Sequence, residues 1–220
     1  ESRFRGIGRY TLSIAKAIIR NNSQHEIFIA LSALFPETIA ELKAQFARLV
    51  PAENIVIWYA PGPVRAMDRN NAWRSECAEY VREAFLHNLK PDVVFITSLF
   101  EGHVDNAVTS IAKLTPKTKV AVLHHDLIPL VQADVYLQDD VYKDYYLKKI
   151  NWLKNADLLL TNSDYTSSEV IEWLDIPESK VCTISAATEE HFDISEISAN
   201  NFSELKEKYG ITRDVVLYAP

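Results

Sequence analysis

The chain has 220 residues, a formal net charge of −7 and 48% hydrophobic residues, which is enough apolar material for one large or two small domains. The negative charge argues against general nucleic-acid binding, and no apolar run approaches the roughly 18 residues of a membrane span. No charged-then-apolar leader opens the sequence, so we expect a cytoplasmic protein. Cys77 and Cys182 lack metal-ligand spacing and lie in apolar patterns, which predicts buried thiols in a reducing compartment.

The first segment, FRGIGRYTLSIAKAI at residues 4–18, contains two glycines followed by an amphipathic helix pattern. Gly6 and Gly8 fit a strand-to-helix turn that approaches a phosphate closely. Thr11 stands where the dinucleotide fingerprint has its third glycine, so a phosphate turn and a plain loop both stay open. Such a turn follows a strand, and the last residues, DVVLYAP, begin a further β-branched run. We therefore expect both ends to be cut from a longer protein.

Strand-like and helix-like patterns then alternate along the chain. Apolar or alternating runs predict strands at 25–32, 54–60, 92–98, 119–126, 157–163, 180–185 and 215–219. Helical spacing occurs at 12–19, 39–46, 80–89, 147–153 and 170–174, and Thr166 with Glu169 has the spacing of a capping box. Several runs are apolar on consecutive residues, which is typical of strands covered on both faces. The sequence thus predicts an α/β fold with a Rossmann-like, doubly wound, mostly parallel sheet.

Polar residues follow the central strands, at the sheet edge where such folds bind ligands. They are Glu101, Gly102 and His103; His124, His125 and Asp126; Asn162 and Ser163; and residues 186–190. The group at 101–103 fits either contacts to the hydroxyl groups of a ligand or the first turn of a helix. Asn162 and Ser163 are cap-forming residue types, so a helix cap and a ligand contact are both open for them.

The segments GIGRYT, HHDLIP, TNSDYTSSEV and ISAATEEHF occur in this order. With them the chain resembles, over nearly its whole length, the N-terminal half of the retaining, nucleotide-sugar-dependent glycosyltransferases of family 4, group 1. The resemblance implies a GT-B architecture, in which two Rossmann-like domains face each other across a cleft. The acceptor lies mainly on the N-terminal domain and the sugar nucleotide mainly on the other. We expect residues 1–213 to form the acceptor-side domain without its first strand, and 214–220 to begin a truncated donor-binding domain.

The resemblance also implies roles for single residues. It places His125 and Asp126 in the family's His-Asp position, or His124 if the match is shifted by one residue. This catalytic group would contact the transferred sugar or the acceptor hydroxyl. Adjacent residues of a strand point to opposite faces, so if the strand extends that far we expect at most one of the two histidines to face the cleft. The other implied positions are Gly6, Gly8 and Arg9, facing the donor phosphates, and Glu101, Gly102, His103, Asn162 and Ser163, binding the acceptor.

The implied reaction moves a sugar, with mannose a candidate, from a nucleotide sugar to a saccharide or lipid-linked saccharide with retention, as in polysaccharide biosynthesis. No cofactor or metal is implied, and the chain alone is expected to be inactive. Where relatives carry Asn-Gly-Val-Asp, this chain has residues 186–189, Ala-Ala-Thr-Glu, so contacts that need a glycine there are not expected.

Two other functions stay open: a self-contained α/β ligand-binding module and a Rossmann sugar-nucleotide enzyme. The missing third glycine and the lack of an evident Tyr-x-x-x-Lys pair count against the second, although Lys149 stands four places after Tyr145. A weak contact with the inner membrane face is a further alternative. It rests on basic residues close to a tryptophan and a methionine. The residues are Arg65, Met67, Arg69, Trp73, Arg74 and Arg82. Acidic residues in the same segment fit an ordinary solvated helix equally well.

Overall fold

The computed structural model describes residues 6–22, 24–114, 118–187, 199–213 and 215. The chain divides into two compact units, Glu1–Ala186 and Ala187–Pro220. Among the described residues, the first unit holds both sheets and all of the helices but one. The second holds a single described helix, α8 (Ala199–Tyr209). The domain boundary that the sequence predicts at residue 213 stays a prediction.

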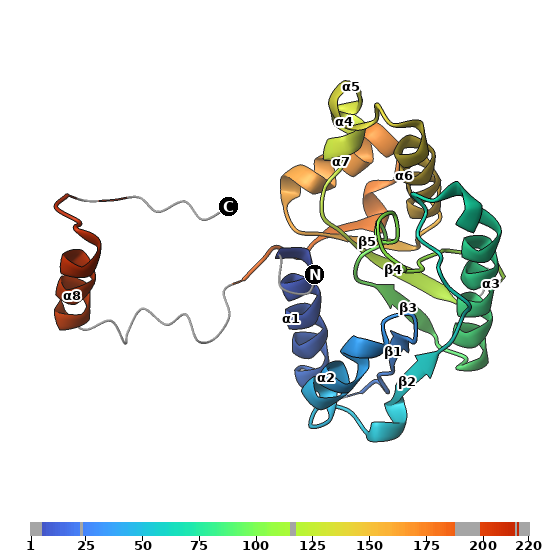
Figure 1. Cartoon of the computed structure of the whole chain (residues 1–220), viewed down its shortest axis with the longest axis horizontal. Helices are drawn as coiled ribbons and strands as arrows, with labels where there is room; N and C mark the ends of the chain where they lie inside the picture. The colour runs from blue at the N-terminus through green and yellow to red at the C-terminus, as the bar shows by residue number, and fades with distance from the viewer. Residues whose placement is uncertain (1–5, 23, 115–117, 188–198, 214, 216–220) are drawn as a thin grey trace. The chain divides into compact units, whose positions relative to one another are not determined.

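Strands and helices alternate through the first unit (Figure 1). The strands are β1 (Ile29–Ser32), β2 (Ile55–Trp58), β3 (Val93–Ile96), β4 (Lys119–His124), β5 (Leu158–Thr161) and β6 (Val181–Thr183). The α-helices are α1 (Gly6–Arg20), α2 (Pro36–Phe46), α3 (Ala72–Asn88), α4 (Ile128–Val131), α5 (Ala133–Tyr136), α6 (Asp140–Leu153) and α7 (Asp164–Leu174). Short 3₁₀ helices are η2 (Ala52–Asn54), η3 (Arg69–Asn71) and η4 (Glu178–Lys180).

All described strand pairs are parallel. β1 pairs with β2, and a second sheet has the order β3-β4-β5-β6. The α/β class and the parallel sheet are therefore confirmed. Every strand predicted between residues 25 and 185 contains an observed strand, shortened at one or both ends. The strand predicted at 215–219 lies outside the described residues except for Val215, which is not in a strand.

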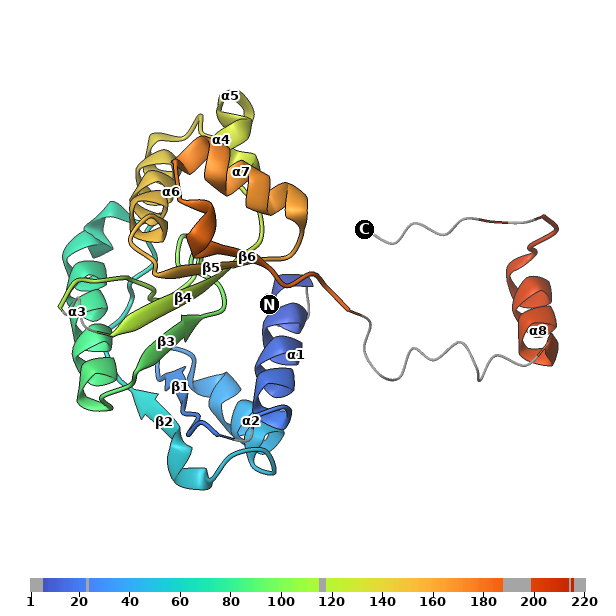
Figure 2. The ribbon, with the colours of Figure 1, turned by 180° about the vertical axis from the view of Figure 1, so that it is seen from behind.

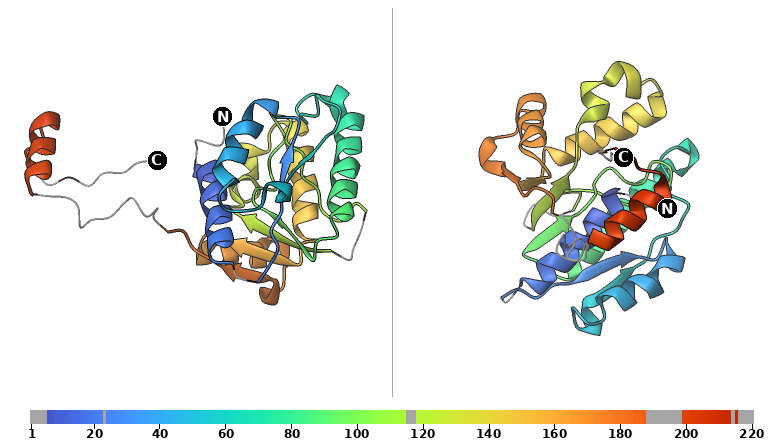
Figure 3. Two further views of the ribbon diagram at one scale, coloured as in Figure 1. Left: turned by 90° about the horizontal axis from the view of Figure 1, so that it is seen from below. Right: turned by 90° about the vertical axis from the view of Figure 1, so that its left-hand side faces the viewer.

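Helices cover both faces of the strands, as a doubly wound fold requires. In β2, Ile55 packs with Ile19 of α1 and Phe46 of α2, whereas Trp58 packs with Ala78 of α3. Since side chains three residues apart on a strand point to opposite faces, these two contacts mark the two sides of the sheet. Figures 2 and 3 show the same arrangement, with α1 and α3 on opposite sides of the strands.

The largest core lies around β3, β4 and β5. Val122 and Leu159 from the strands pack with Leu153 of α6 and Val170 of α7, and all four side chains are almost fully buried. Consecutive residues of β4 from Ala121 to His124 are buried, because helices or loops cover both faces of this strand. This rigid centre fixes the end of β4, where the sequence predicts the functional histidines.

Two local predictions are wrong. Helix α7 is capped by Ser163, whose Oγ accepts a hydrogen bond from the Thr166 amide at 3.1 Å, so no capping box joins Thr166 and Glu169. Ser163 has the extended backbone that a cap needs, whereas Thr166 already lies in the helix. The thiols of Cys77 and Cys182 are exposed rather than buried. Cys182 lies on β6, the last strand of its sheet, and its side chain is exposed there.

Candidate active site

A hollow of about 160 Å³ lies at the carboxyl ends of β3 and β4. Its walls come from the first turn of α1, the segment after β3, the end of β4, α4 and one face of α6. The lining residues are Ile7, Ser98, Leu99, Phe100, Glu101, Leu123, His124, His125, Asp126, Pro129, Tyr142 and Tyr146. Aromatic walls with a few converging polar groups are typical of sites for small ligands.

His124 is the last residue of β4 and pairs in register with Thr161 of β5. Its side chain is only 1% exposed and lies against the Phe100 ring, with ring centroids 5.9 Å apart. Within the described part of the chain neither of its ring nitrogens has a hydrogen-bond partner. Burial, helped by the neighbouring His125, lowers the pKa of His124 to about 3. The imidazole is therefore neutral at ordinary pH and has one donor and one acceptor to offer.

His125 follows the strand and is half-buried. Its ring meets the Tyr10 ring edge-on at 5.8 Å. Burial lowers its pKa, and this outweighs the backbone hydrogen bond to Thr97 and the nearby carboxylates, which raise it. Both histidines line the hollow, and the expectation that at most one would face the cleft applied only if the strand continued through His125. Side chains no longer alternate between the two faces of the sheet at His125, because β4 ends at His124.

Asp126 and Glu101 bring carboxylates to the hollow. Asp126 is exposed, and its Oδ1 accepts a hydrogen bond from the Ile128 amide at 3.1 Å, which starts α4. Glu101 Oε1 accepts a hydrogen bond from Ser98 Oγ at 3.0 Å. Each carboxylate has more acceptor positions than these contacts use, so both are suited to binding hydroxyl groups of a ligand.

The rest of the predicted acceptor group does not line the hollow. Gly102 has a φ of +106°, and its carbonyl accepts a hydrogen bond from the Ala66 amide, so it acts as a turn residue. The His103 ring packs between Tyr142 and Tyr145, with centroids 4.9 and 5.2 Å away. No helix occurs between β3 and β4 in the residues that the structure describes, so the alternative of a helix start at 101–103 is wrong.

Asn162 and Ser163 serve the helix rather than the hollow. Ser163 is the N-cap of α7, and Asn162 Oδ1 accepts a hydrogen bond from Thr166 Oγ1 at 3.0 Å. The capping alternative is confirmed for Ser163, whereas Asn162 contacts a side chain of the helix. Thr166 Oγ1 also lies 3.3 Å from the His125 carbonyl, so the cap of α7 is linked to the segment after β4.

The opening glycines belong to a helix rather than a turn, since α1 begins at Gly6 and includes Gly8. Ile7, between them, lines the hollow, and Arg9 is exposed. The Tyr10 hydroxyl donates to the Ser185 carbonyl at 2.5 Å, which ties the start of α1 to the segment after β6. The predicted glycine turn is therefore corrected to the first turn of a helix beside the hollow.

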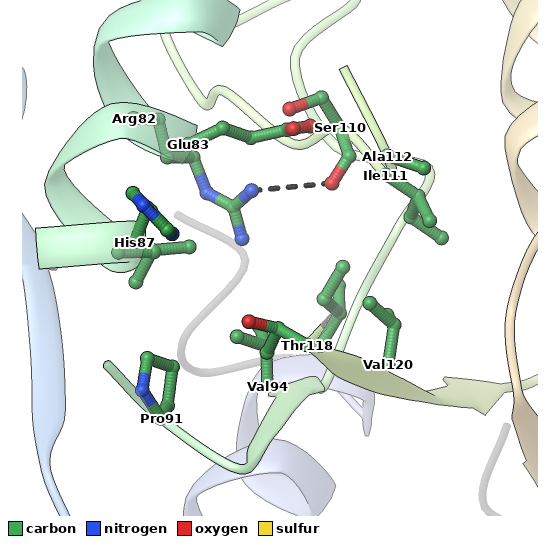
Figure 4. A pocket seen from close by; sticks show the side chains of 12 residues that line it. Arg82, Glu83, His87, Pro91, Val94, Ser110, Ile111, Ala112, Thr118 and Val120 are labelled. Carbon is green, nitrogen blue, oxygen red and sulfur yellow. Dashed lines mark hydrogen bonds between the residues drawn. The ribbon is translucent and has the colours of Figure 1, made fainter. Parts of the chain in front are cut away.

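A smaller cavity of about 40 Å³ lies at the opposite edge of the sheet, near the amino ends of β3 and β4. Figure 4 shows Arg82 reaching across it to the Ser110 carbonyl, to which Nη1 donates at 3.2 Å. Burial lowers the pKa of Arg82 to about 10. This cavity is thus much smaller than the hollow beyond β4.

Sequence reasoning missed the tyrosines of the hollow. Tyr142 and Tyr146 stand four residues apart on α6, a spacing that puts both side chains on one face of a helix. That spacing was the available signal. No such signal marked Tyr10, whose ring contacts the His125 ring edge-on, because only the fold brings α1 next to the end of β4.

The parallel α/β unit with a polar hollow beyond its strand ends is a ligand-binding fold of the Rossmann-like class. Residues 4–189 match the sequence model of the protein family described as Glycosyltransferase Family 4. The chain belongs to this family. The family that the sequence motifs indicate is therefore confirmed.

Curated relatives are similar to nearly the whole chain. A serotype-specific mannosyltransferase WbdA of Escherichia coli is 34% identical over 218 residues, which are 99% of this chain and 26% of that protein. Two further Escherichia coli proteins of the same name are 32% identical over 205 residues, 93% of this chain. The chain thus spans about a quarter of the length of these relatives. No solved structure matches it.

Two kinds of feature are absent from the residues that the structure describes. No helix there is long and apolar enough to cross a bilayer. No cluster of three or more histidine, cysteine, aspartate or glutamate side chains there could hold a metal ion.

Proposed function

We propose that this chain supplies the acceptor side of a retaining GT-B glycosyltransferase. The enzyme moves a sugar from a nucleotide sugar to a saccharide or lipid-linked saccharide, and the name of the relatives points to mannose. The observation that carries the proposal is the hollow beyond β4, where two histidines and two carboxylates converge in a chain of this family.

The chemistry of the hollow suits a hydroxyl acceptor. A neutral imidazole can accept a proton from a hydroxyl or hold that hydroxyl in place, and the lowered pKa values of His124 and His125 favour this neutral form. Asp126 and Glu101 add hydrogen-bond acceptors at the same opening. The aromatic side chains of Phe100, Tyr142 and Tyr146 would exclude water from a bound sugar ring.

The donor would approach from another part of the protein. The first turn of α1, at Gly6, Gly8 and Arg9, ends in the partial positive charge of a helix N-terminus, which favours phosphate. The coverage of only a quarter of the relatives supports a longer enzyme in which a second domain grips the nucleotide. The chain alone would then not transfer sugar. We further propose a cytoplasmic location, with exposed Trp73 and Met67 as candidates for peripheral membrane contact.

Alanine substitutions at the hollow test the proposal in the protein that carries this chain. His125→Ala and Asp126→Ala should each lower the transfer rate at least about tenfold, because they remove groups that orient a reacting hydroxyl. His124→Ala should have a smaller effect. Initial rates with a panel of nucleotide sugars and mannose-containing acceptors measure this, with melting curves as a check on folding.

His87→Ala is the matched control, since His87 lines the small cavity at the opposite edge of the sheet. It should transfer sugar at the wild-type rate. A larger loss for His124→Ala than for His125→Ala would move the catalytic role by one residue. Wild-type rates for all three site variants would favour a ligand-binding module instead.

A further inference from the structure

Helix α6 places a buried lysine against the loop that follows β3. Lys149 is 4% exposed, and its Nζ donates to Thr109 Oγ1 at 2.5 Å and to the Thr109 carbonyl at 3.1 Å. Thr109 Oγ1 donates in turn to the Leu99 carbonyl at 2.6 Å. A continuous chain of hydrogen bonds therefore runs from the helix through Thr109 to the start of the loop.

A second contact from the same helix face supports the first. The Tyr145 hydroxyl donates to the Phe100 carbonyl at 2.7 Å. Tyr145 and Lys149 are four residues apart, so their side chains lie on one face of α6. Leu99 and Phe100, whose carbonyls are held in this way, form one wall of the hollow. Tyr145 and Lys149, which have the Tyr-x-x-x-Lys spacing, thus both hold the loop after β3.

Lys149 is not needed to pair the buried Glu79. Lys113 and Lys148 already contact the Glu79 carboxylate, at 2.8 and 2.7 Å. Lys149 Nζ instead lies over the rings of Tyr145 and Trp152, at 5.1 and 4.8 Å from their centroids.

Charged groups surround Lys149 from several elements. Glu79 and Arg82 face it from α3, Lys148 from α6, and Glu101 from the loop. Burial lowers the pKa of Lys149 to about 7. Burying an amine is unfavourable unless its hydrogen bonds are made, and Lys149 Nζ donates both to the carbonyl and to the hydroxyl of Thr109. The two hydrogen bonds to Thr109 therefore offset the cost of burying the Lys149 amine and tie it to the loop.

We infer that Lys149 is a positioning residue that, through Thr109, holds residues 98–109 in the conformation in which Phe100 and Glu101 face the hollow. The inference rests on the proposed function for its consequence, which is correct placement of the acceptor. The anchoring itself can be measured without any transfer activity.

Hydrogen exchange in the protein that carries this chain tests the anchoring. The amides of Ala66 and Met67 bond to the carbonyls of Gly102 and His103, and the Ala107 amide bonds within the loop, so they report whether the loop is held. Lys149→Met and Thr109→Val should raise their exchange rates about tenfold, as expected when local opening becomes easier. Thr109→Ser keeps the hydroxyl and should exchange as the wild type does.

Lys148→Met is the matched control. Lys148 is the neighbouring lysine of the same helix, and it contacts Glu79 and the Trp152 ring but not the loop. This variant should leave exchange at the three amides unchanged. In transfer assays, Lys149→Met and Thr109→Val should raise the acceptor KM about fivefold and leave the donor KM unchanged, because the loop forms the acceptor wall.

Unchanged exchange in both Lys149→Met and Thr109→Val would overturn the inference. So would faster exchange with wild-type acceptor KM, since the lysine would then be structural only. If Lys149→Met does not fold, the contrast between Thr109→Val and Thr109→Ser decides. A wild-type protein that transfers no sugar would refute the proposed function, while exchange would still decide whether Lys149 holds the loop.

Discussion

Replacing Gly102 with alanine should lower the free energy of unfolding by about 3 kcal/mol, through backbone strain and a steric clash together. Gly102 has a φ of +106°, a region that residues with a side chain rarely adopt. A Cβ at this position would lie 2.2 Å from the Ala107 carbonyl oxygen, which is backbone and cannot rotate away. The loop beside the hollow must therefore shift if any side chain is added.

Gly6→Ala is the control for this substitution. Gly6 lies in the first turn of α1, and a Cβ there would meet nothing within 4 Å. The Gly6→Ala substitution should change the free energy of unfolding by less than about 1 kcal/mol, and helix propensity favours alanine. Urea unfolding of the two variants and the wild type measures the difference. Equal stability of Gly102→Ala and the wild type would show that the loop adapts without cost.

Acid should destabilise the protein through His124. The pKa of this buried imidazole is lowered from 6.5 to about 3, so between these values the unfolded chain binds a proton that the folded chain does not. Stability therefore falls as the pH drops below 6.5. From the two pKa values, the loss between pH 8 and pH 5 is about 2 kcal/mol from this residue alone.

The variant His124→Phe removes the titrating group and keeps a planar ring of similar shape against Phe100. Its free energy of unfolding should depend on pH less steeply than that of the wild type, by about 2 kcal/mol over the same interval. Urea unfolding at several pH values gives both slopes. Identical slopes would mean that His124 takes up its proton in the folded state after all.

The sequence predicted the sheet well because its strands are covered on both faces. A strand such as β4 appears as a run of consecutive apolar residues, and such a run can be recognised without knowing which strands lie beside it. The exposed thiol of Cys182 was missed for the opposite reason. Its strand is the last of the sheet, and position within a sheet is decided by pairing, which the sequence does not display.

The site was predictable only in part. The pair His124 and His125 could be found because ligands of such folds bind after the strand ends. The sequence could not predict that both histidines line the hollow, because this depends on β4 ending at His124. Tyr10 comes to His125 from a helix more than a hundred residues away in the chain, a contact made by tertiary packing. Ser163 shows how a strong cap residue can prevail over a capping-box pattern nearby.

The central claim is that the hollow beyond β4 binds the saccharide acceptor next to its histidines. NMR of the histidine ring nitrogens during titration with a mannose-containing acceptor tests it directly in the protein that carries this chain. The account predicts that the signals of His124 and His125 shift with acceptor, because their ring nitrogens gain hydrogen bonds, and that the signal of His87 at the other cavity does not. Saturation of the acceptor site with no change at either His124 or His125 would contradict the account.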